Sequence, residues 1–197
     1  MQPGMRPGTT TGLVTDAELV EQARRAPERF AAIFDRHYPD IYAYVAKRLG
    51  PDLAEDVASE TFLVAFDRRR SFDPARGEVR PWLFGIASNL AARHVRAETR
   101  RYRALARAGG QPDEQSGHAD AVAGRLDAAA VRGRLAEALR RLPEPVRAVL
   151  LLVAWAGLNQ QEAAVALGIP AGTARSRLHR ARQEMRQALD FEIEADE

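Results

Sequence analysis

Five arginines follow a tight-turn signature near the carboxyl end of the chain, and their positions suggest contact with DNA. Ala164, Gly168 and Ala174 have the spacing of a helix-turn-helix, in which small residues let two helices cross closely and the glycine makes the turn. A cationic helix after such a turn is typical of a protein that inserts this helix into the DNA major groove. The arginines of the expected helix are Arg175, Arg177, Arg180, Arg182 and Arg186.

A second candidate nucleic-acid surface lies in the helix expected from Pro81 to about Arg100. Stacking on a base, hydrogen bonding to a base edge and neutralising phosphate require an aromatic, an amide and cations, and this combination favours an unpaired strand or a flipped base. The pattern also fits a core tryptophan beside a solvated helix face, so both interpretations stay open here. At about 100° per residue, one stripe of the helix holds Leu83, Ile86, Ala87, Leu90 and His94, and a different side holds Trp82, Asn89, Arg93, Arg96 and Arg100.

The elements that must position this helix are expected to be helical as well. A capping box at residues 15–18 predicts a first helix. Further helices are expected near Pro27 and, separately, after Pro39. A fourth is expected to be capped by Asp52 and to run to about Arg69.

The carboxyl-terminal part is expected to form its own helical domain. Residues 109–117 have the composition of a linker, and the apolar run 146–155 predicts a helix buried on most sides. No strand-like alternation longer than a few residues occurs. The expected fold is therefore all-α, with two small helical domains joined by a flexible linker and a helix-turn-helix in the second. The expected divisions are a disordered 1–14, a first domain 15–100, a linker 101–127, a second domain 128–189 and an acidic tail 190–197.

Composition excludes several classes of function. The 197 residues contain no cysteine, no apolar run long enough to cross a bilayer and no secretory signal pattern, so a cytoplasmic protein is expected. The four histidines lack metal-ligand spacing, and no phosphate loop or nucleophile motif is present. We therefore expect no enzyme, no cofactor and no metal. The net charge is only +2, but residues 61–109 and 171–189 are strongly basic, which suggests two contacts with a polyanion.

Two motif blocks give the chain, over roughly residues 15–189, a resemblance to a known family. The first block is 52–66 followed by 80–89, and the second is 142–144, 157–158, 161–164 and 167–182. In this order and at this distance, they resemble the extracytoplasmic-function (ECF) sigma factors of bacterial RNA polymerase. The match departs at Ser59, where the family usually has glutamine, so the detail of polymerase binding is not carried over there.

The resemblance implies a function and partners. The first domain would be sigma region two, which binds the clamp helices of the polymerase β′ subunit and melts the minus-ten promoter element. The second would be region four, which reads the minus-thirty-five element and touches the β flap. An anti-sigma factor is a further implied partner. If the two domains pack together and hide their basic faces, the free chain should bind DNA poorly.

Residues are carried over one position at a time from the family motifs. Asp56, Glu60 and Thr61 match the polar face that meets β′, although acids at this spacing also fit a solvated helix face. Asn89 matches the position that holds a flipped minus-ten base, and Trp82 the tryptophan that opens the same helix. Arg93, Arg96 and Arg100 lie on the same side as Asn89. The minus-thirty-five candidates are Thr173, Arg175, Ser176, Arg177, His179 and Arg180.

One alternative from a different class is a stand-alone helix-turn-helix regulator that acts as a dimer. It would account for residues 159–189. It would leave residues 52–100 unexplained, and no heptad or other dimer seam is evident in the sequence.

Overall fold

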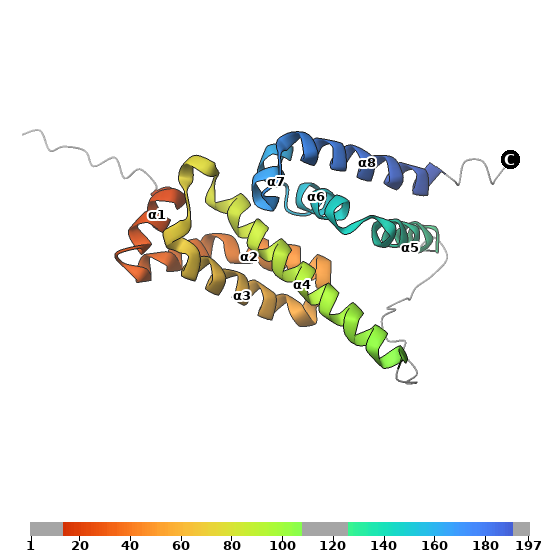
Figure 1. Ribbon diagram of the computed structural model, residues 1–197, viewed down its shortest axis with the longest axis horizontal. Coiled ribbons are helices and arrows are strands. Elements are labelled where there is room, and N and C mark those ends of the chain that lie inside the picture. The colour runs from red at the N-terminus through yellow and green to blue at the C-terminus, as the bar shows by residue number, and fades with distance from the viewer. Residues whose placement is uncertain (1–13, 108–125, 191–197) are drawn as a thin grey trace, which may run out of the picture.

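The computed structural model of the chain describes residues 14–107 and 126–190 (Figure 1). These residues form α-helices and short 3₁₀ helices, and they contain no strand. The predicted all-α class is therefore confirmed. The segment 1–14, for which disorder was predicted, lies outside the described residues except for Val14, and so do most of the linker 101–127 and most of the acidic tail 190–197.

The amino-terminal helices form a bundle that we call the N-terminal module. The helices α2 (Ala31–Leu49) and α3 (Pro51–Arg68) pack along each other, and both contact α4 (Val79–Arg107). Two 3₁₀ turns, Arg69–Ser71 and Pro74–Arg76, lie in the loop between α3 and α4. The module consists of α1 (Asp16–Ala23), η1 (Pro27–Phe30), α2 (Ala31–Leu49), α3 (Pro51–Arg68) and α4 (Val79–Arg107).

The start of α1 agrees with the sequence analysis. The Thr15 hydroxyl accepts a hydrogen bond from the Glu18 backbone N–H at 3.3 Å, and the Glu18 carboxylate accepts one from the Thr15 N–H at 2.8 Å. This reciprocal pair satisfies two backbone donors that the first helical turn leaves free. The predicted capping box and the helix start at Asp16 are confirmed.

The prediction of separate helices on either side of Pro39 is wrong. A single helix, α2, runs from Ala31 to Leu49 with Pro39 inside it. A proline removes one helical hydrogen bond, and here burial of Ile33 on one side of it and Ile41 on the other holds the helix together.

The start of α3 also differs from the prediction, because Asp52 does not cap it. The helix begins at Pro51, directly after Gly50 with a φ of 88° and no side-chain cap. Proline is favoured at this first position because its missing N–H would have no helical partner there. The carboxyl end at Arg68 is close to the prediction.

The carboxyl-terminal helices, which we call the C-terminal module, contain the predicted helix-turn-helix. Gly168 adopts the left-handed conformation at the turn, with φ 63° and ψ 35°. Ala164 and Ala174 are buried where the two helices cross. The motif predicted from Ala164, Gly168 and Ala174 is confirmed. The module consists of α5 (Leu126–Arg141), α6 (Glu144–Ala154), α7 (Gln160–Leu167) and α8 (Ala171–Asp190).

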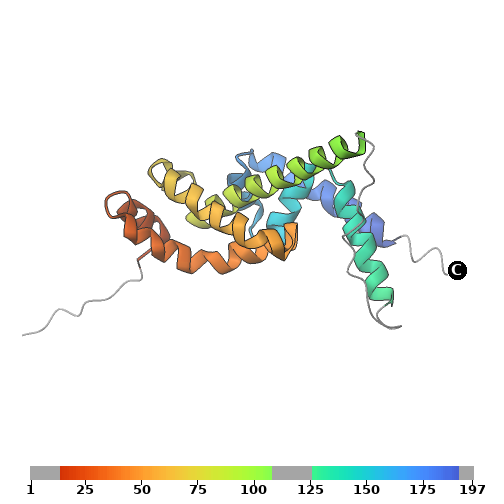
Figure 2. The same ribbon diagram turned by 90° about the horizontal axis from the view of Figure 1, so that it is seen from below.

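The two modules pack against each other along α4 (Figure 1). The C-terminal module lies along one side of α4 and α2 and α3 along the other, so the N-terminal half of α4 is buried on nearly all sides. Leu152 and Leu158 belong to the same apolar core as Leu83 and Phe84. The C-terminal part of α4 extends away from α2 and α3 (Figures 1 and 2). No helix among the described residues is long and apolar enough to span a membrane.

Candidate nucleic-acid and polymerase interface

The exposed face of α4 is formed by the amide and the arginines that the sequence analysis placed together. Asn89 is exposed between the buried residues Ser88 and Leu90, and it is the single exposed residue from Val79 to Ala92. Beyond it, three arginines continue the exposed face: Arg93, Arg96 and Arg100. An amide followed by a cationic track can hydrogen-bond a base edge while phosphates bind alongside.

A groove of about 340 Å³ runs beside these arginines and brings two predicted sites together. The Glu60 carboxylate on α3 lies 3.9 Å from an Arg93 guanidinium nitrogen and 3.9 Å from His94 Nε2. Glu60 was predicted to contact polymerase and Arg93 to contact DNA. The structure thus places one acid of the predicted polymerase face at the edge of the predicted DNA face.

His94 does not belong to the buried stripe in which the sequence analysis placed it. Its side chain is 38% exposed, whereas Leu83 and Leu90 on the same stripe are buried. At His94 the helix has passed the end of the packed core, so the stripe reaches solvent.

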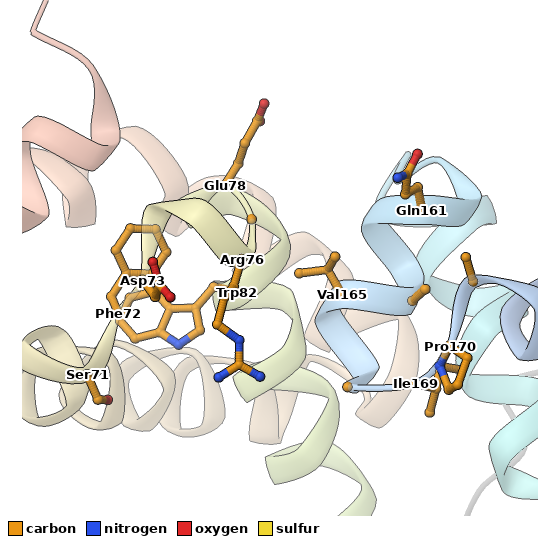
Figure 3. A pocket seen from close by; sticks show the side chains of 14 residues that line it. Ser71, Phe72, Asp73, Arg76, Glu78, Trp82, Gln161, Val165, Ile169 and Pro170 are labelled. Carbon is orange, nitrogen blue, oxygen red and sulfur yellow. The ribbon is translucent and has the colours of Figure 1, made fainter.

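Trp82 combines a core role with an exposed edge. Its indole packs on the Phe72 ring with a centroid distance of 5.1 Å and an interplanar angle of 47°. Its other side borders a pocket of about 680 Å³ between the α3–α4 loop and the turn of the helix-turn-helix. Figure 3 shows Trp82 and Arg76 on one side of this pocket and Ile169 and Pro170 on the other.

The predicted polymerase residues on α3 divide into exposed and buried positions. Asp56 is exposed and Glu60 is half-buried. Thr61 is fully buried, and its hydroxyl donates a hydrogen bond to the Val57 carbonyl at 2.7 Å. Thr61 therefore does not lie on an exposed polar face, and that prediction is corrected. Thr61 follows Glu60 by one residue, so its side chain points to a different side of α3, into the core. Its hydroxyl bonds there to the backbone of its own helix.

The sequence analysis missed an aromatic row on α2 that packs against Phe62 of α3. Phe34 stacks on Tyr38 with a centroid distance of 4.7 Å, and Tyr38 on Tyr42 at 6.2 Å. Phe34 and Tyr42 are exposed, as is Leu63 on α3, at 66%. The signal was the i, i+4, i+8 spacing of the three rings, and the expected helix break at Pro39 obscured it.

The helix α8 presents its predicted residues to solvent to different degrees. Ser176 donates from its hydroxyl to the Thr173 carbonyl at 3.0 Å, and Arg180 pairs with Glu184 at 2.8 Å on the next turn. Exposed guanidinium groups near the start of a helix are well placed for phosphates, which the helix N-terminus also attracts. The exposed candidates are Arg175, Ser176, His179 and Arg180, and the half-buried ones are Thr173 and Arg177.

The described part of the chain offers no group of three His, Cys, Asp or Glu side chains that could hold a metal ion. Its candidate surfaces consist of cations, amides, hydroxyls and aromatic rings. Such surfaces bind polyanions and proteins.

Comparisons with known proteins match two stretches of the chain to sigma-factor regions. Residues 33–101 match the family described as Sigma-70 region 2, and residues 132–185 match Sigma-70, region 4. The ECF RNA polymerase sigma factor SigC of Mycobacterium tuberculosis is 33% identical over 146 residues, which cover 74% of this chain and 75% of the relative. The RNA polymerase sigma factor CarQ of Myxococcus xanthus is 29% identical over 177 residues, covering 86% and 94%.

Two solved structures have a similar fold. CnrH, in complex with the cytosolic domain of CnrY, has a TM-score of 0.61 and 28% identity, and the match covers 90% of this chain and 98% of CnrH. The sigma factor RpoE from Bartonella quintana, in complex with the anti-sigma factor NepR, has a TM-score of 0.58 and 25% identity, and covers 83% and 98%. With both sigma regions matched in order and a relative above 30% identity over three quarters of its length, the chain belongs to the ECF group of the sigma-70 family of RNA polymerase sigma factors.

Proposed function

We propose that this ECF sigma factor binds core RNA polymerase, directs it to promoters through two DNA contacts and helps to open the duplex. The observation that carries the proposal is the pair of separate exposed cationic surfaces, on α4 and α8, in one chain that matches both sigma regions. The chain would catalyse no reaction itself. Because its partners act at the chromosome, we place it in the cytoplasm. A stand-alone regulator would need only α8 and would leave the α4 face without a role.

For polymerase, we propose that α2 and α3 supply the contact surface. Asp56 is exposed on α3, and the aromatic row on α2 with Leu63 adds apolar area nearby. An acidic face with an apolar centre fits the β′ clamp helices if these present arginines around apolar side chains. Glu60 would contribute at the margin, and Thr61 would act by holding α3 in shape.

For the minus-ten element, we propose that Asn89 holds an unpaired base and that Arg93, Arg96 and Arg100 bind the adjacent phosphates. Asn89 is surrounded by buried residues, so its amide is held on a rigid helix. Capturing an exposed base offsets part of the unstacking free energy, on the order of a few kcal/mol per base. Trp82 would chiefly support the loop before α4 through Phe72.

For the minus-thirty-five element, we propose that α8 enters the major groove of intact duplex. Arg175, Ser176, His179 and Arg180 would face the bases and phosphates, with Thr173 and Arg177 at the margin. The C-terminal module would also touch the β flap. An anti-sigma factor is a further proposed partner, because both structural relatives above were determined as complexes with CnrY or NepR.

The proposed domain limits are 15–100 for region two and 128–189 for region four, with 101–127 as the linker and 190–197 as an acidic tail. The helix α4 continues to Arg107 and α5 begins at Leu126, so helical structure extends into both ends of this linker.

The polymerase contact can be tested by titrating the labelled chain with core polymerase. The chain has no cysteine, so a dye on Gln183→Cys reports binding without competing labels. We expect tight binding by the labelled chain and at least tenfold weaker binding after Asp56→Arg. The exposed acid Glu28, on η1, provides the matched control Glu28→Arg, which should change little. Absence of binding to core polymerase would refute the proposed function.

A further inference from the structure

The pocket between the α3–α4 loop and the helix-turn-helix, which we call the interdomain pocket, has the size and walls of a small-molecule site. Its volume of about 680 Å³ is usual for ligand sites, which often form between domains. One wall comes from the loop and the start of α4, and the other from α7, the turn at Gly168 and the start of α8. Of the residues proposed above to contact polymerase or DNA, only Trp82 lines this pocket. The proposed function therefore leaves the pocket without a role.

The wall from the α3–α4 loop offers an aromatic ring that is held in place. The half-buried Trp82 indole is supported from behind by the Phe72 ring, at a centroid distance of 5.1 Å. The Phe72 carbonyl accepts a hydrogen bond from the Arg24 guanidinium of α1 at 2.7 Å, so the support is tied to a further helix. A ring held in this way lets a planar ligand stack without further ordering of the wall.

The facing wall is apolar and is also fixed. Val165 of α7 is 42% exposed although it is a large apolar residue, and Ile169 and Pro170 continue the same wall (Figure 3). The Ile169 backbone N–H donates to the Ala164 carbonyl at 3.0 Å, which holds the turn. A Cβ added to Gly77 would lie 2.6 Å from Val165 Cγ1, so the two walls come into contact there. An apolar ring that displaces water from both walls is favoured in this space.

One cation without a partner lies in the interdomain pocket. Arg76 is exposed, and within the described part of the chain its side chain makes neither an ion pair nor a hydrogen bond. Figure 3 shows its guanidinium group between Trp82 and the wall formed by Ile169 and Pro170. A guanidinium group in this position is available to pair with an anionic group of a ligand.

The acids that line the pocket limit the charge of that ligand. The Asp73 carboxylate accepts a hydrogen bond from the Ala75 backbone N–H at 3.0 Å, and the Glu78 side chain points away from the pocket (Figure 3). Neither acid pairs with Arg76, but their negative charges disfavour a ligand with several phosphates. A single guanidinium group between apolar walls matches one carboxylate, which it binds through two parallel hydrogen bonds.

We propose that the interdomain pocket binds a small planar aromatic acid with a single carboxylate. The ring lies between Trp82 and Val165, and the carboxylate pairs with Arg76. Apolar walls select the ring, and the one unpaired cation selects the single negative charge. This site goes beyond the proposed function, which assigns no small molecule to the chain.

Two probes of the same shape test the requirement for charge. Cinnamic acid is an anion at neutral pH, and cinnamamide is its neutral analogue. Titration calorimetry on the full chain measures the Kd of each probe. We expect a Kd below about 1 mM for the acid, and binding weaker by about tenfold or more for the amide, because hydrogen bonds between charged groups are the stronger ones. No binding of the acid in this range, or equal binding of the two probes, would overturn the proposal.

Two variants separate the cation from the apolar wall. Arg76→Gln should weaken binding of the acid by about tenfold or more and change binding of the amide by less than about twofold. Val165→Ala should weaken both probes by a similar factor, because both use the apolar wall. An unchanged affinity for the acid in Arg76→Gln would contradict the role of this cation.

Matched controls lie outside the interdomain pocket. Arg182→Gln removes an exposed arginine of α8, and Leu63→Ala removes an exposed apolar side chain of α3. Neither should change the affinity for the acid or for the amide. Circular dichroism checks that all four variants keep their helices. An equal loss of acid binding in Arg182→Gln and Arg76→Gln would show that the probe responds to overall charge, and it would refute the site.

Methyl resonances show where the acid binds. The aromatic row on α2, with Leu63 of α3, is a competing apolar surface for an aromatic probe. In a nuclear magnetic resonance titration of methyl-labelled chain, we expect saturable shifts at Val165 and Ile169 and none at Leu63. Shifts centred on Leu63 would place the acid on that competing surface and would overturn the proposal.

Discussion

At the scale of single residues, the account depends most on Asn89. Its neighbours Ser88 and Leu90 are buried, and Asn89 is the single exposed residue from Val79 to Ala92. The buried neighbours fix the stretch of helix from which the Asn89 amide projects, which supports selective binding of one base.

We predict that Asn89→Ala lowers promoter opening by about fivefold to 150-fold, because one good base contact is worth about 1–3 kcal/mol. Permanganate reactivity of unpaired thymines in a polymerase–promoter complex measures the effect. Affinity for core polymerase should stay the same, since Asn89 lies away from the α2–α3 surface. Normal promoter opening by Asn89→Ala would show that Asn89 does not hold an unpaired base.

A second residue prediction separates Thr61 from the polymerase surface. Thr61→Val keeps the shape and loses one buried hydrogen bond, so it should cost about 1 kcal/mol in the free energy of unfolding. Its affinity for core polymerase should remain within a factor of two, in contrast to Asp56→Arg. Chemical denaturation and the polymerase titration distinguish the two roles. A large loss of polymerase binding in a stable Thr61→Val protein would contradict the burial argument.

The sequence correctly predicted the exposure of residues whose side of the helix follows from the rotation of about 100° per residue. The exposed stripe of Asn89, Arg93 and Arg96 was predicted from rotation along one helix alone. Thr61 was misplaced because a motif match gives the position of a residue along the chain and does not give its burial. His94 was misplaced because the stripe continues past Ala92, the last residue that is buried in the described part of α4.

At the scale of elements, local chemistry decides where helices begin. The helix α7 opens with a capping box in which the Asn159 side chain accepts from the Gln161 and Glu162 N–H groups at 2.9 Å. The Glu162 carboxylate accepts from the Asn159 N–H at 2.7 Å. This box fixes the residue at which the first helix of the helix-turn-helix begins.

We predict that Asn159→Ala destabilises the protein by about 1 kcal/mol, the usual cost of losing an N-cap. Thermal unfolding followed by circular dichroism should show a lower midpoint. The matched control is Gln161→Ala, in the first turn of the same helix, where no side-chain hydrogen bond is lost. Equal stability of Asn159→Ala and the unchanged chain would count against the cap.

The free energy of unfolding is predicted to depend on pH through the contact between α1 and α2. Burial tends to raise the pKa of Asp16, but hydrogen bonds from Arg36 at 2.8 Å and His37 at 2.6 Å outweigh it and hold the pKa below its usual 3.8. A lowered folded-state pKa stabilises the protein above the unfolded value and loses that effect as pH falls through the folded value. The stability advantage over Asp16→Asn should therefore be full at neutral pH and shrink below pH 3.8. Urea unfolding across this range measures it, and a constant difference would contradict the ion contact.

Several element boundaries could be predicted, and those at Pro39 and at the start of α3 could not. The cap at Thr15 and the turn at Gly168 depend on residues only a few positions away in the sequence. The predictions made from those residues therefore agree with the structure. The continuity of α2 through Pro39 depends on packing against α3 and α4, which are distant in the chain. Local signals cannot report such packing.

At the scale of the whole molecule, the chain is two helical modules closed on each other. The apolar run in α6 correctly predicted a helix buried on most sides, but its pattern is the same whether the partner is α8 or the N-terminal module. Leu151 and Leu152 of α6 belong to the core shared with the N-terminal module, whereas Val149 of α6 packs with Ala174 and Leu178 of α8. The closed arrangement depends on long-range contacts, for example Arg48 with Glu144, that no spacing in the sequence reveals.

The central claim is that this chain gives core polymerase its choice of promoter, and sequencing of RNA 5′ ends tests it most directly. Core polymerase would transcribe genomic DNA of the source organism in vitro, with and without the purified chain. We predict that adding the chain produces a set of discrete new start sites preceded by shared elements near minus ten and minus thirty-five, and that Asn89→Ala depletes them. Identical start sites with and without the chain would contradict the account.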